Sequence, residues 1–366
     1  MPAALLSVEE NRTRKTEEKI MKRIGTLALV LALALTGCAQ GGAYGRPEGG
    51  PAEGTLEVHY IDVGQADSAL VLCGGESMLI DGGNVADSDL VVAYLANQGV
   101  EELDYVVCTH AHEDHVGGLA GALSQYPAGE VLAPVTEYDS RAFENFLKYT
   151  QEQGLSITVP EPGDAWTVGS ATVTVLGPVQ DYEETNDTSI VLRLDFGENS
   201  FLFTGDMERT AEEDLLAAGA YVEAGVLKVG HHGSDTSTSY PFLRAVDPDY
   251  AVISVGEDND YGHPSEDVLS RLRDDDVTLY RTDLQGDVVC TSDGTNLTFT
   301  VERNAEVQTN PTEEESQPGT YIGNLSSHVF HRPDCSGLPA EENQVAFSSR
   351  EEAAAAGYTP CGRCEP

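Results

Sequence analysis

Hydrophobic and polar positions alternate in short runs between residues 55 and 303, and these runs predict alternating strands and helices. Leu56, Val58 and Tyr60 alternate with more polar residues, as in a half-buried strand. Further strands are expected at 68–72, 78–80, 105–108, 155–159, 166–176, 189–196, 200–204, 226–229 and 250–255, helices at about 88–98, 140–153 and 207–218, and a closing hairpin at 287–301. Because strands flanked by helices recur in two successive halves, we predict an α/β fold with two packed sheets and helices outside them.

The segment that follows the strand expected at 105–108 contains four metal-ligand side chains within six residues. They are His110, His112, Asp114 and His115. Such groups are costly to desolvate together unless they are paired or coordinated. We expect a strand-to-helix loop, with the helix opening at Val116, on which the first two side chains face one ion and the last two face a second. A solvated polar loop is the alternative, which the specific ligand spacing disfavours.

Ligand-type residues also follow three other predicted strands. Asp81 lies in an Asp-Gly-Gly turn, Asp206 follows Thr204-Gly205, and the adjacent pair His231 and His232 follows the strand expected at 226–229. Each of these motifs is weak by itself. Because the carboxyl ends of strands converge at one edge of such a fold, their repetition predicts one shared site.

These motifs, in this order, resemble those of the metallo-β-lactamase superfamily. The segments Asn-Asp-Thr-Ser-Ile-Val-Leu at 186–192 and Tyr-Gly-His-Pro-Ser at 261–265 resemble the soluble nuclease-like domain of the ComEC/Rec2 competence proteins. The resemblance covers residues 55–303. It implies a four-layer αββα sandwich, one or two divalent metals (Zn²⁺ or Mn²⁺), and hydrolysis by a metal-activated water.

The resemblance also implies a role for each candidate residue. His110 and His112 would bind the first metal, Asp114 and His115 would bind the second, and Asp206 would bridge both. Either His231 or His232 would complete the second site, and Asp81 would orient the ligands. Asp114, Asp206 and His263 would be the catalytic residues. The superfamily's third histidine on the first metal is missing here, because no histidine lies between His115 and His231. Asn186, Asp187 or Ser189 could supply an oxygen instead, and oxygen donors favour manganese over zinc.

Two further residues are candidates for contact with a substrate phosphate or for protonation of the leaving group. They are Lys228, on an apolar strand, and His263, which precedes a proline. The sequence is equally compatible with purely structural roles, in which Lys228 is an ordinary strand residue and His263 is a turn histidine with satisfied hydrogen bonds.

The C-terminal residues 320–366, which follow a polar linker at 304–319, are expected to form a small separate module. Its candidate zinc ligands are His331, Cys335, Cys361 and Cys364. The segment resembles the metal-binding domain of the Ada DNA-repair proteins, with His331 where that family has its first cysteine, so methyl transfer is not expected. We expect a closed structural Zn²⁺ site that stabilises the module. His328 is a competing ligand, and a disulfide between the last two cysteines is the alternative.

The N-terminal residues 1–37 are expected to be a signal peptide. A charged segment at 21–23 precedes an apolar run at 24–36, which is too short for a comfortable transmembrane helix. The run ends in Leu-Thr-Gly-Cys, which resembles the bacterial lipoprotein cleavage box and implies lipidation of Cys38. Residues 38–54 read as a flexible tether. We therefore expect a lipoprotein, or a secreted protein, at the extracellular face of the membrane, touching the membrane through its lipid anchor only.

The strong acidity of the chain limits its partners. The net charge is −42; six of the 20 Lys+Arg residues and four of the 62 Asp+Glu residues precede Cys38, which leaves 14 basic and 58 acidic side chains. This balance argues against tight non-specific binding of nucleic acid. The favoured function is a metal-dependent phosphodiesterase or nuclease that acts on DNA or nucleotides. The alternatives are a hydrolase of small esters, lactones or thioesters, and a non-catalytic surface binding module.

Overall fold

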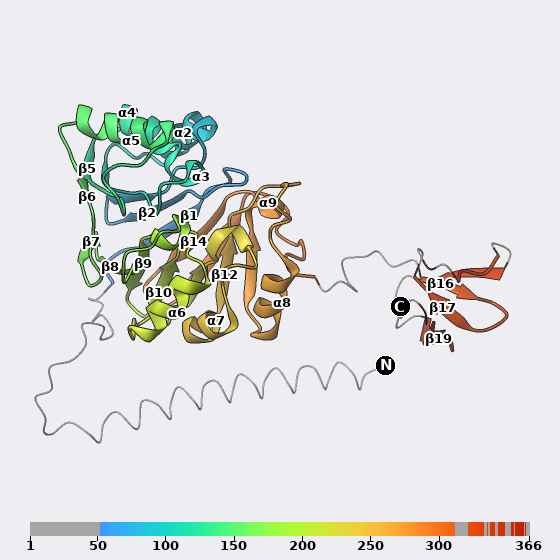
Figure 1. The fold of residues 1–366 in the computed structure, drawn as a ribbon. Helices are drawn as coiled ribbons and strands as arrows, with labels where there is room; N and C mark the ends of the chain where they lie inside the picture. The colour runs from blue at the N-terminus through green and yellow to red at the C-terminus, as the bar shows by residue number, and fades with distance from the viewer. Residues whose placement is uncertain are drawn as a thin grey trace, which may run out of the picture. The chain divides into compact units, whose positions relative to one another are not determined.

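The computed structural model describes residues 52–311 and most of a C-terminal module, namely 321–332, 335, 337–340, 343–347, 353–354, 356–361 and 363 (Figure 1). The expected signal peptide, the lipidation site Cys38, most of the expected tether, residues 312–319 of the expected linker and the candidate ligand Cys364 lie outside the described residues. Within the described residues, no helix combines the length and the apolar character needed to cross a membrane.

The first of two large sheets has eight strands in the order β15-β14-β1-β2-β3-β4-β5-β6. Its strands are β1 (Leu56–Tyr60), β2 (Ala69–Cys73), β3 (Glu76–Ile80), β4 (Leu103–Val107), β5 (Ala128–Leu132), β6 (Ile157–Thr158), β14 (Val288–Ser292) and β15 (Leu297–Val301). Strands β3 to β6 pair in parallel, whereas the other neighbours are antiparallel. The ends of β3 and β4 therefore lie at the same edge.

The second sheet has seven strands in the order β13-β12-β11-β10-β9-β8-β7. Its strands are β7 (Ala165–Val168), β8 (Ala171–Gly177), β9 (Val191–Phe196), β10 (Asn199–Phe203), β11 (Val226–Lys228), β12 (Tyr250–Ile253) and β13 (Thr278–Arg281). Strands β10 to β13 pair in parallel. This sheet therefore also gathers several strand ends at one edge.

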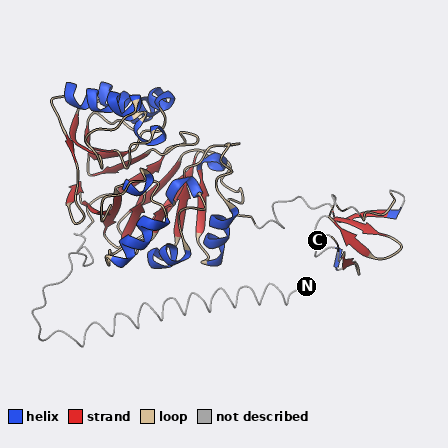
Figure 2. Cartoon of the chain, viewed as in Figure 1, coloured by secondary structure: helices blue, strands red, loops and turns tan. Residues whose placement is uncertain are grey.

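Helices cover the outer faces of both sheets, as Figure 2 shows in blue against the red strands. The helical segments are η1 (Val85–Asp87), α2 (Ser88–Asn97), α3 (Glu113–Val116), α4 (Leu119–Gln125), α5 (Arg141–Glu152), η2 (Asn186–Thr188), α6 (Arg209–Ala217), η3 (Gly230–Gly233), α7 (Tyr240–Val246), α8 (Glu266–Asp274) and α9 (Thr282–Gln285). One apolar cluster fills the space between the sheets, and one further cluster packs helices against each sheet. The predicted four-layer αββα sandwich is confirmed.

Several local predictions were wrong or incomplete. The single strand expected at 166–176 is a hairpin of β7 and β8 that turns at Gly169, whose φ of +56° suits glycine. The helix expected to open at Val116 begins at Glu113, so part of the ligand motif is helical. The sequence reading also missed β5, β13, α7 and α8.

The C-terminal module contains a four-stranded sheet with the order β18-β16-β17-β19. Its strands are β16 (Tyr321–Asn324), β17 (Val329–His331), β18 (Gln344–Phe347) and β19 (Thr359–Pro360). Among its described residues, the buried apolar cluster consists of Tyr321, Phe330, Phe347 and Ala353. So small a core is typical of modules that need a metal or another cross-link for stability.

Candidate metal centre

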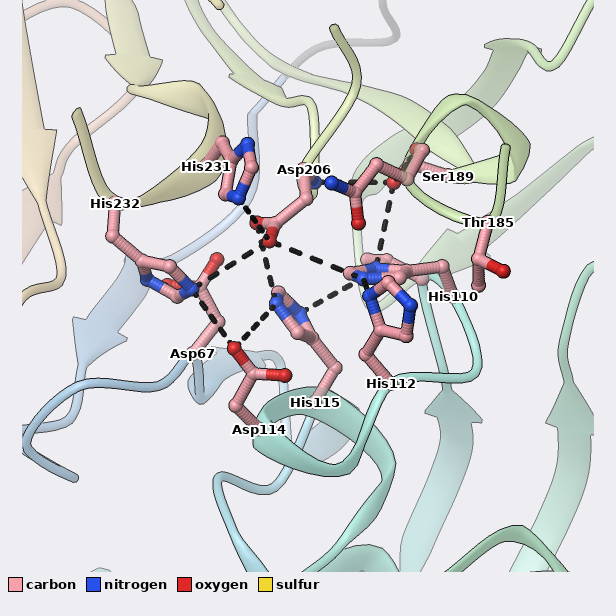
Figure 3. A network of polar contacts seen from close by, with 12 residues as sticks. Asp67, His110, His112, Asp114, His115, Thr185, Ser189, Asp206, His231 and His232 are labelled. Carbon is pink, nitrogen blue, oxygen red and sulfur yellow. Dashed lines mark hydrogen bonds and ion pairs between the residues drawn. The ribbon is translucent and has the colours of Figure 1, made fainter. Parts of the chain in front are cut away.

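The candidate ligands lie in the segments that follow β3, β4, β10 and β11, which include the short helices α3 and η3. Figure 3 shows most of these side chains gathered around Asp206. A close backbone approach brings Asp206 into this group. A Cβ on the preceding Gly205, which has a φ of +52°, would lie 2.8 Å from Ser189 Oγ and 2.9 Å from Thr109 Oγ1. The tight Gly-Asp turn therefore requires glycine at this position.

Four of the predicted ligands form a compact cluster: Asp114, His115, Asp206 and His232. One ligand atom from each lies within 4.8 Å of the others. His115 Nε2 is 3.2 Å from Asp206 Oδ1, and His232 Nε2 is 3.3 Å from Asp114 Oδ2 (Figure 3). His232 Nε2 also lies 3.6 Å from the second carboxylate oxygen of Asp206. The structure thus brings together ligand residues that are separated by more than a hundred positions in the chain.

The cluster fits a divalent metal ion. His115 Nε2, His232 Nε2 and Asp206 Oδ1 are all buried and make no hydrogen bond in the described part of the chain. Buried polar atoms are rarely left in this condition, because each costs free energy unless it is paired or coordinated. Two imidazole nitrogens with two carboxylates form a donor set that zinc accepts well.

The His231–His232 pair, which the sequence left ambiguous, divides into two different positions. Both residues have left-handed backbones, with φ of 49° and 52°. Such strain in a non-glycine residue is typical of functional sites. His232 is buried within the cluster, whereas His231 is partly exposed, with its Nε2 3.7 Å from Asp206 Oδ2 and its Nδ1 3.1 Å from Thr236 Oγ1.

His110 and His112 lie on the other side of Asp206. His110 Nε2 is 3.9 Å from Asp206 Oδ2 and 3.1 Å from His112 Nδ1. Within the described residues, however, no third donor forms a compact ligand group with these two histidines. The donors expected for the first metal are therefore less well assembled than those of the second.

Of the three oxygen donors expected for this first metal, Asp187 and Ser189 are engaged in other hydrogen bonds. Asn186 donates to Glu208 Oε1 at 3.1 Å, and Asp187 accepts a hydrogen bond from the backbone N–H of Glu208 at 3.0 Å, just before α6. Ser189 Oγ comes within 3.5 Å of His110 Nδ1, but it also receives the backbone N–H of Asp206. Asp187 is therefore occupied by the start of α6, whereas Asn186 Oδ1 is buried without a hydrogen-bond partner in the described residues and stays a candidate oxygen donor.

Asp81 lies behind His115, where an orienting residue was predicted. It has a φ of 57°, and its carboxylate accepts three hydrogen bonds: from the backbone N–H and the hydroxyl of Thr109, both at 2.7 Å, and from His115 Nδ1 at 2.8 Å. A carboxylate that receives the Nδ1 proton fixes the tautomer of the imidazole. Nε2 of His115 is thereby left free to face the cluster.

The charges in the cluster are strongly coupled. Burial alone would lower the pKa of His115, but the carboxylates of Asp206, Asp81 and Asp114 outweigh burial and hold this pKa well above its usual value. His232 behaves similarly: burial opposes its charge, but Asp206 and Asp67 raise its pKa to about 10. Without a metal, imidazolium groups therefore balance the carboxylates, and a bound metal ion would replace their protons.

Lys228 and His263, the two candidates for contact with substrate, differ in accessibility. Lys228 is buried, and its Nζ lies 2.9 Å from Asp67, so it is not available to a phosphate. His263 is half-buried beside the cluster, with its ring centroid 5.7 Å from that of His231. Of the two, only His263 stays positioned for substrate contact.

Asp67 is a site residue that the sequence reading missed. Its buried carboxylate pairs with Lys228 and lies 3.5 Å from His232 Nδ1. A signal existed in the sequence, because a lysine on an apolar strand needs a buried anion. The sequence could not reveal which of its many acids that anion is.

The described residues of the C-terminal module contain a second ligand group. His331, Cys335 and Cys361 each place one donor atom within 4.8 Å of the others, and His331 Nδ1 is 3.4 Å from Cys335 Sγ. Cys73, Cys108, Cys290 and Cys335, which lie in the described part of the chain, are buried free thiols. Two thiols and one imidazole suit zinc.

Two segments of the chain match known families. Residues 61–257 match the metallo-β-lactamase superfamily. Residues 312–366 match the metal binding domain of Ada. The first range contains Asp81, the four residues of the cluster and Asp67, and it ends before His263. The C-terminal module is therefore an Ada-type zinc-binding domain.

Individual proteins also match the chain. ComE operon protein 3 of Bacillus subtilis (strain 168) is 30% identical over 251 residues, which cover 63% of this chain and 32% of that protein. Competence protein ComA of Neisseria gonorrhoeae is 35% identical over 243 residues, which cover 66% and 33%. The chain thus spans about a third of the length of these relatives. The crystal structure of the metallo-β-lactamase fold protein YhfI from Bacillus subtilis aligns with a TM-score of 0.46 and 14% identity, covering 65% of this chain and all of that one.

Proposed function

Because the chain belongs to the metallo-β-lactamase superfamily and is thus built as a metal-dependent hydrolase, we propose that it cleaves phosphodiester bonds in DNA or nucleotides. The observation that carries this proposal is the cluster of Asp114, His115, Asp206 and His232, whose unpaired buried atoms converge as metal ligands would. The similarity to a competence protein and to a ComE operon protein supports a phosphodiester substrate, since competence is the uptake of DNA.

The residues around the cluster divide the catalytic work. Asp114, His115, Asp206 and His232 would hold a divalent ion, which would supply a water nucleophile of lowered pKa near neutral pH. Asp206 lies between the two histidine pairs and could hold the ion from either side. Asp81 and the backbone carbonyl of Ser254, which accepts from His232 Nδ1 at 3.0 Å, keep the two imidazoles aimed at the ion.

His263 is the best-placed hydrogen-bond donor for a substrate oxygen. Gln65 Oε1 accepts from the backbone N–H of Gly256 at 3.1 Å, which fixes the orientation of the Gln65 amide. The amide nitrogen of Gln65 therefore faces His263 Nδ1, 3.4 Å away. This arrangement makes Nδ1 the acceptor and leaves the proton on Nε2, which can donate to a phosphate oxygen or to the leaving group.

The acidic charge of the protein limits how many substrate phosphates it can contact. Several basic groups are already committed: Lys228 to Asp67, Arg193 to Asp195 at 2.6 Å, and Arg271 to the carbonyls of Ser237 and Thr238. Because these basic groups are committed within the described residues, we infer that the protein contacts few phosphates at a time. Its affinity for DNA should therefore depend only weakly on salt, because the salt dependence scales with the number of phosphates neutralised.

The location of the protein belongs to the same proposal. The charged and apolar segments before Cys38 support a lipid-tethered enzyme at the extracellular face of the cell membrane. At that location it would encounter DNA or nucleotides outside the cell. Globomycin-sensitive processing and mass spectrometry of the mature N-terminus would test the anchor separately from the activity.

One assay series tests the proposed chemistry. Linear DNA, plasmid DNA, bis(p-nitrophenyl) phosphate and a p-nitrophenyl ester are incubated with the protein and Mn²⁺, Zn²⁺ or a chelator. We expect metal-dependent phosphodiester turnover that the Asp206→Ala variant loses. Turnover of the ester alone would indicate the alternative small-molecule hydrolase. A metal-loaded protein that cleaves none of these substrates would indicate a binding module.

A further inference from the structure

The segment between β1 and β2 carries a buried carboxylate, Asp67, that the proposed hydrolysis does not use. Only 5% of Asp67 is exposed, and its side chain points toward His232 (Figure 3). We propose that Asp67, neutralised by Lys228, is a positioning residue that holds the ligand-bearing loops of both sheets in place for the metal. This inference rests on the metal site of the proposed function, but not on its substrate.

The backbone of Asp67 joins two of these loops on the first sheet. Its N–H donates to the carbonyl oxygen of Asp114 at 3.0 Å, and its carbonyl oxygen accepts from the N–H of Gly83 at 2.8 Å. Asp114 is itself a member of the cluster, and Gly83 belongs to the turn that begins with Asp81. Asp67 therefore reinforces the direct hydrogen bond from the Gly82 N–H to the His115 carbonyl oxygen (2.7 Å), which also joins the Asp-Gly-Gly turn to α3.

The side chain of Asp67 reaches the second sheet. Its oxygens lie 2.9 Å from Lys228 Nζ, and Oδ1 lies 3.5 Å from His232 Nδ1. Lys228 ends β11, and its ammonium also donates to the carbonyl oxygen of Val229 at 3.0 Å. Because His232 follows Lys228 by four residues, this ion pair fixes the root of the loop that carries it. The carboxylate and the Ser254 carbonyl together surround His232 Nδ1, so Nε2 is directed at the cluster.

Lys228 also explains why a metal ion is not expected to bind between His115, Asp81 and Asp67. Donor atoms of Asp67, Asp81 and His115 lie within 4.8 Å of one another, which is close enough to hold an ion. The ammonium of Lys228 already provides a fixed positive charge beside Asp67. The cavity at this place measures about 10 Å³, which is room for about one water molecule. The positive charge of Lys228 therefore disfavours a metal here and favours the group formed by Asp114, His115, Asp206 and His232.

The test measures Mn²⁺ affinity in the full-length protein with the Asp67→Asn substitution. Mn²⁺ is chosen because it avoids thiolate ligands, so that the zinc-binding module does not contribute. Free Mn²⁺ is followed by electron paramagnetic resonance at a temperature where circular dichroism shows the variant to be folded. We expect the dissociation constant to rise by roughly 10–100-fold, as is typical for residues that orient metal ligands.

A double variant and a control separate positioning from charge balance. Asp67→Asn leaves Lys228 buried without its partner, whereas Asp67→Asn with Lys228→Met removes both charges and should regain thermal stability. We expect the double variant to keep weak Mn²⁺ binding, because the carboxylate beside His232 is still absent. Asp195→Asn breaks a comparable buried pair with Arg193 away from the cluster, and it should change the Mn²⁺ dissociation constant by less than about two-fold.

Other results overturn the inference, the proposed function or both. If Asp67→Asn leaves Mn²⁺ affinity unchanged, or if affinity returns together with stability in the double variant, Asp67 serves only charge balance. If Asp67→Asn does not fold, the double variant alone decides between these outcomes. A wild-type protein that binds Mn²⁺ but cleaves no phosphodiester would contradict the proposed function and leave the role of Asp67 supported. A wild-type protein whose cluster binds neither Mn²⁺ nor Zn²⁺ would overturn both.

Discussion

The two sides of Asp206 offer unequal places for a metal ion. On one side, His115 and His232 lie with Asp114 in a compact group, and each imidazole is held from behind, by Asp81 and by the Ser254 carbonyl. On the other side, His110 and His112 contact each other at 3.1 Å, and no compact third donor joins them within the described residues.

The difference shows which metal ligands the fold holds in position before a metal binds. A ligand that is already oriented loses little freedom when the metal binds, whereas a ligand that must first move lowers the affinity. We therefore expect the side with His115 and His232 to fill first and more tightly. The side with His110 and His112 should bind a second ion more weakly.

Replacement of the residue shared by both sides should have the largest effect. Asp206→Ala removes a buried carboxylate that lies 3.2 Å from His115 and 3.6 Å from His232, so both metals should be lost. Turnover should fall by more than the roughly 100-fold seen when a residue merely supports a ligand. Elemental analysis and phosphodiester assays would measure the two losses. The exposed Asp89→Ala on α2 is the control, and normal metal content in Asp206→Ala would contradict a shared ligand.

Single histidine replacements should separate the two sides. His232→Ala should abolish the tight site, whereas His110→Ala should leave one tight equivalent and remove only the weak one. Metal titration followed by calorimetry would show which step of binding disappears. His231→Ala is the matched control for the adjacent position, since His231 is partly exposed and outside the compact group. Loss of the tight site in His231→Ala, with His232→Ala unaffected, would reverse the assignment.

Loss of the support behind His115 should have a smaller effect. The Asp81 carboxylate accepts three hydrogen bonds. Asp81→Asn keeps the shape of the side chain but replaces one accepting oxygen with an NH₂ donor, so at least one of these hydrogen bonds is lost. We expect metal affinity at the tight site to fall by roughly 10–100-fold, with the weak site little changed. Competition with a chelator would measure this change. Equal weakening at both sites would instead mean that Asp81 stabilises the whole edge of the sheet.

The inequality of the two sides marks the limit of prediction from sequence. The strand ends and the dense His-Asp motif were sufficient to predict a site containing Asp114, His115 and Asp206, because strand ends converge in such a fold. The choice of His232 over His231 depends on two left-handed backbone conformations in η3, which no local pattern specifies. Asp187, though well placed in sequence, is taken up by the backbone before α6.

Long-range pairing was the other limit. Asp67 pairs with Lys228, which lies 161 residues later in the chain. Because the chain is so acidic, the sequence alone does not indicate which carboxylate neutralises Lys228. Alternation predicted most strands well, but it could not show that the apolar run at 166–176 folds back at Gly169. Patterns of short range therefore predicted the layers and the ligand types, while contacts between distant segments determined which ligands are oriented.

The smallest expected effect concerns His263, which lies beside the cluster without belonging to it. Its Nε2 proton can donate one hydrogen bond to substrate, and such a bond contributes about 0.5–1.5 kcal/mol. His263→Ala should therefore reduce kcat/KM by about 2–10-fold while both metal sites keep their affinities. Gln65→Ala, which frees the ring without removing it, should have a weaker effect in the same direction. A loss of metal in His263→Ala would make this residue part of the ligand set and would extend the preorganised side of Asp206 to the loop after β12.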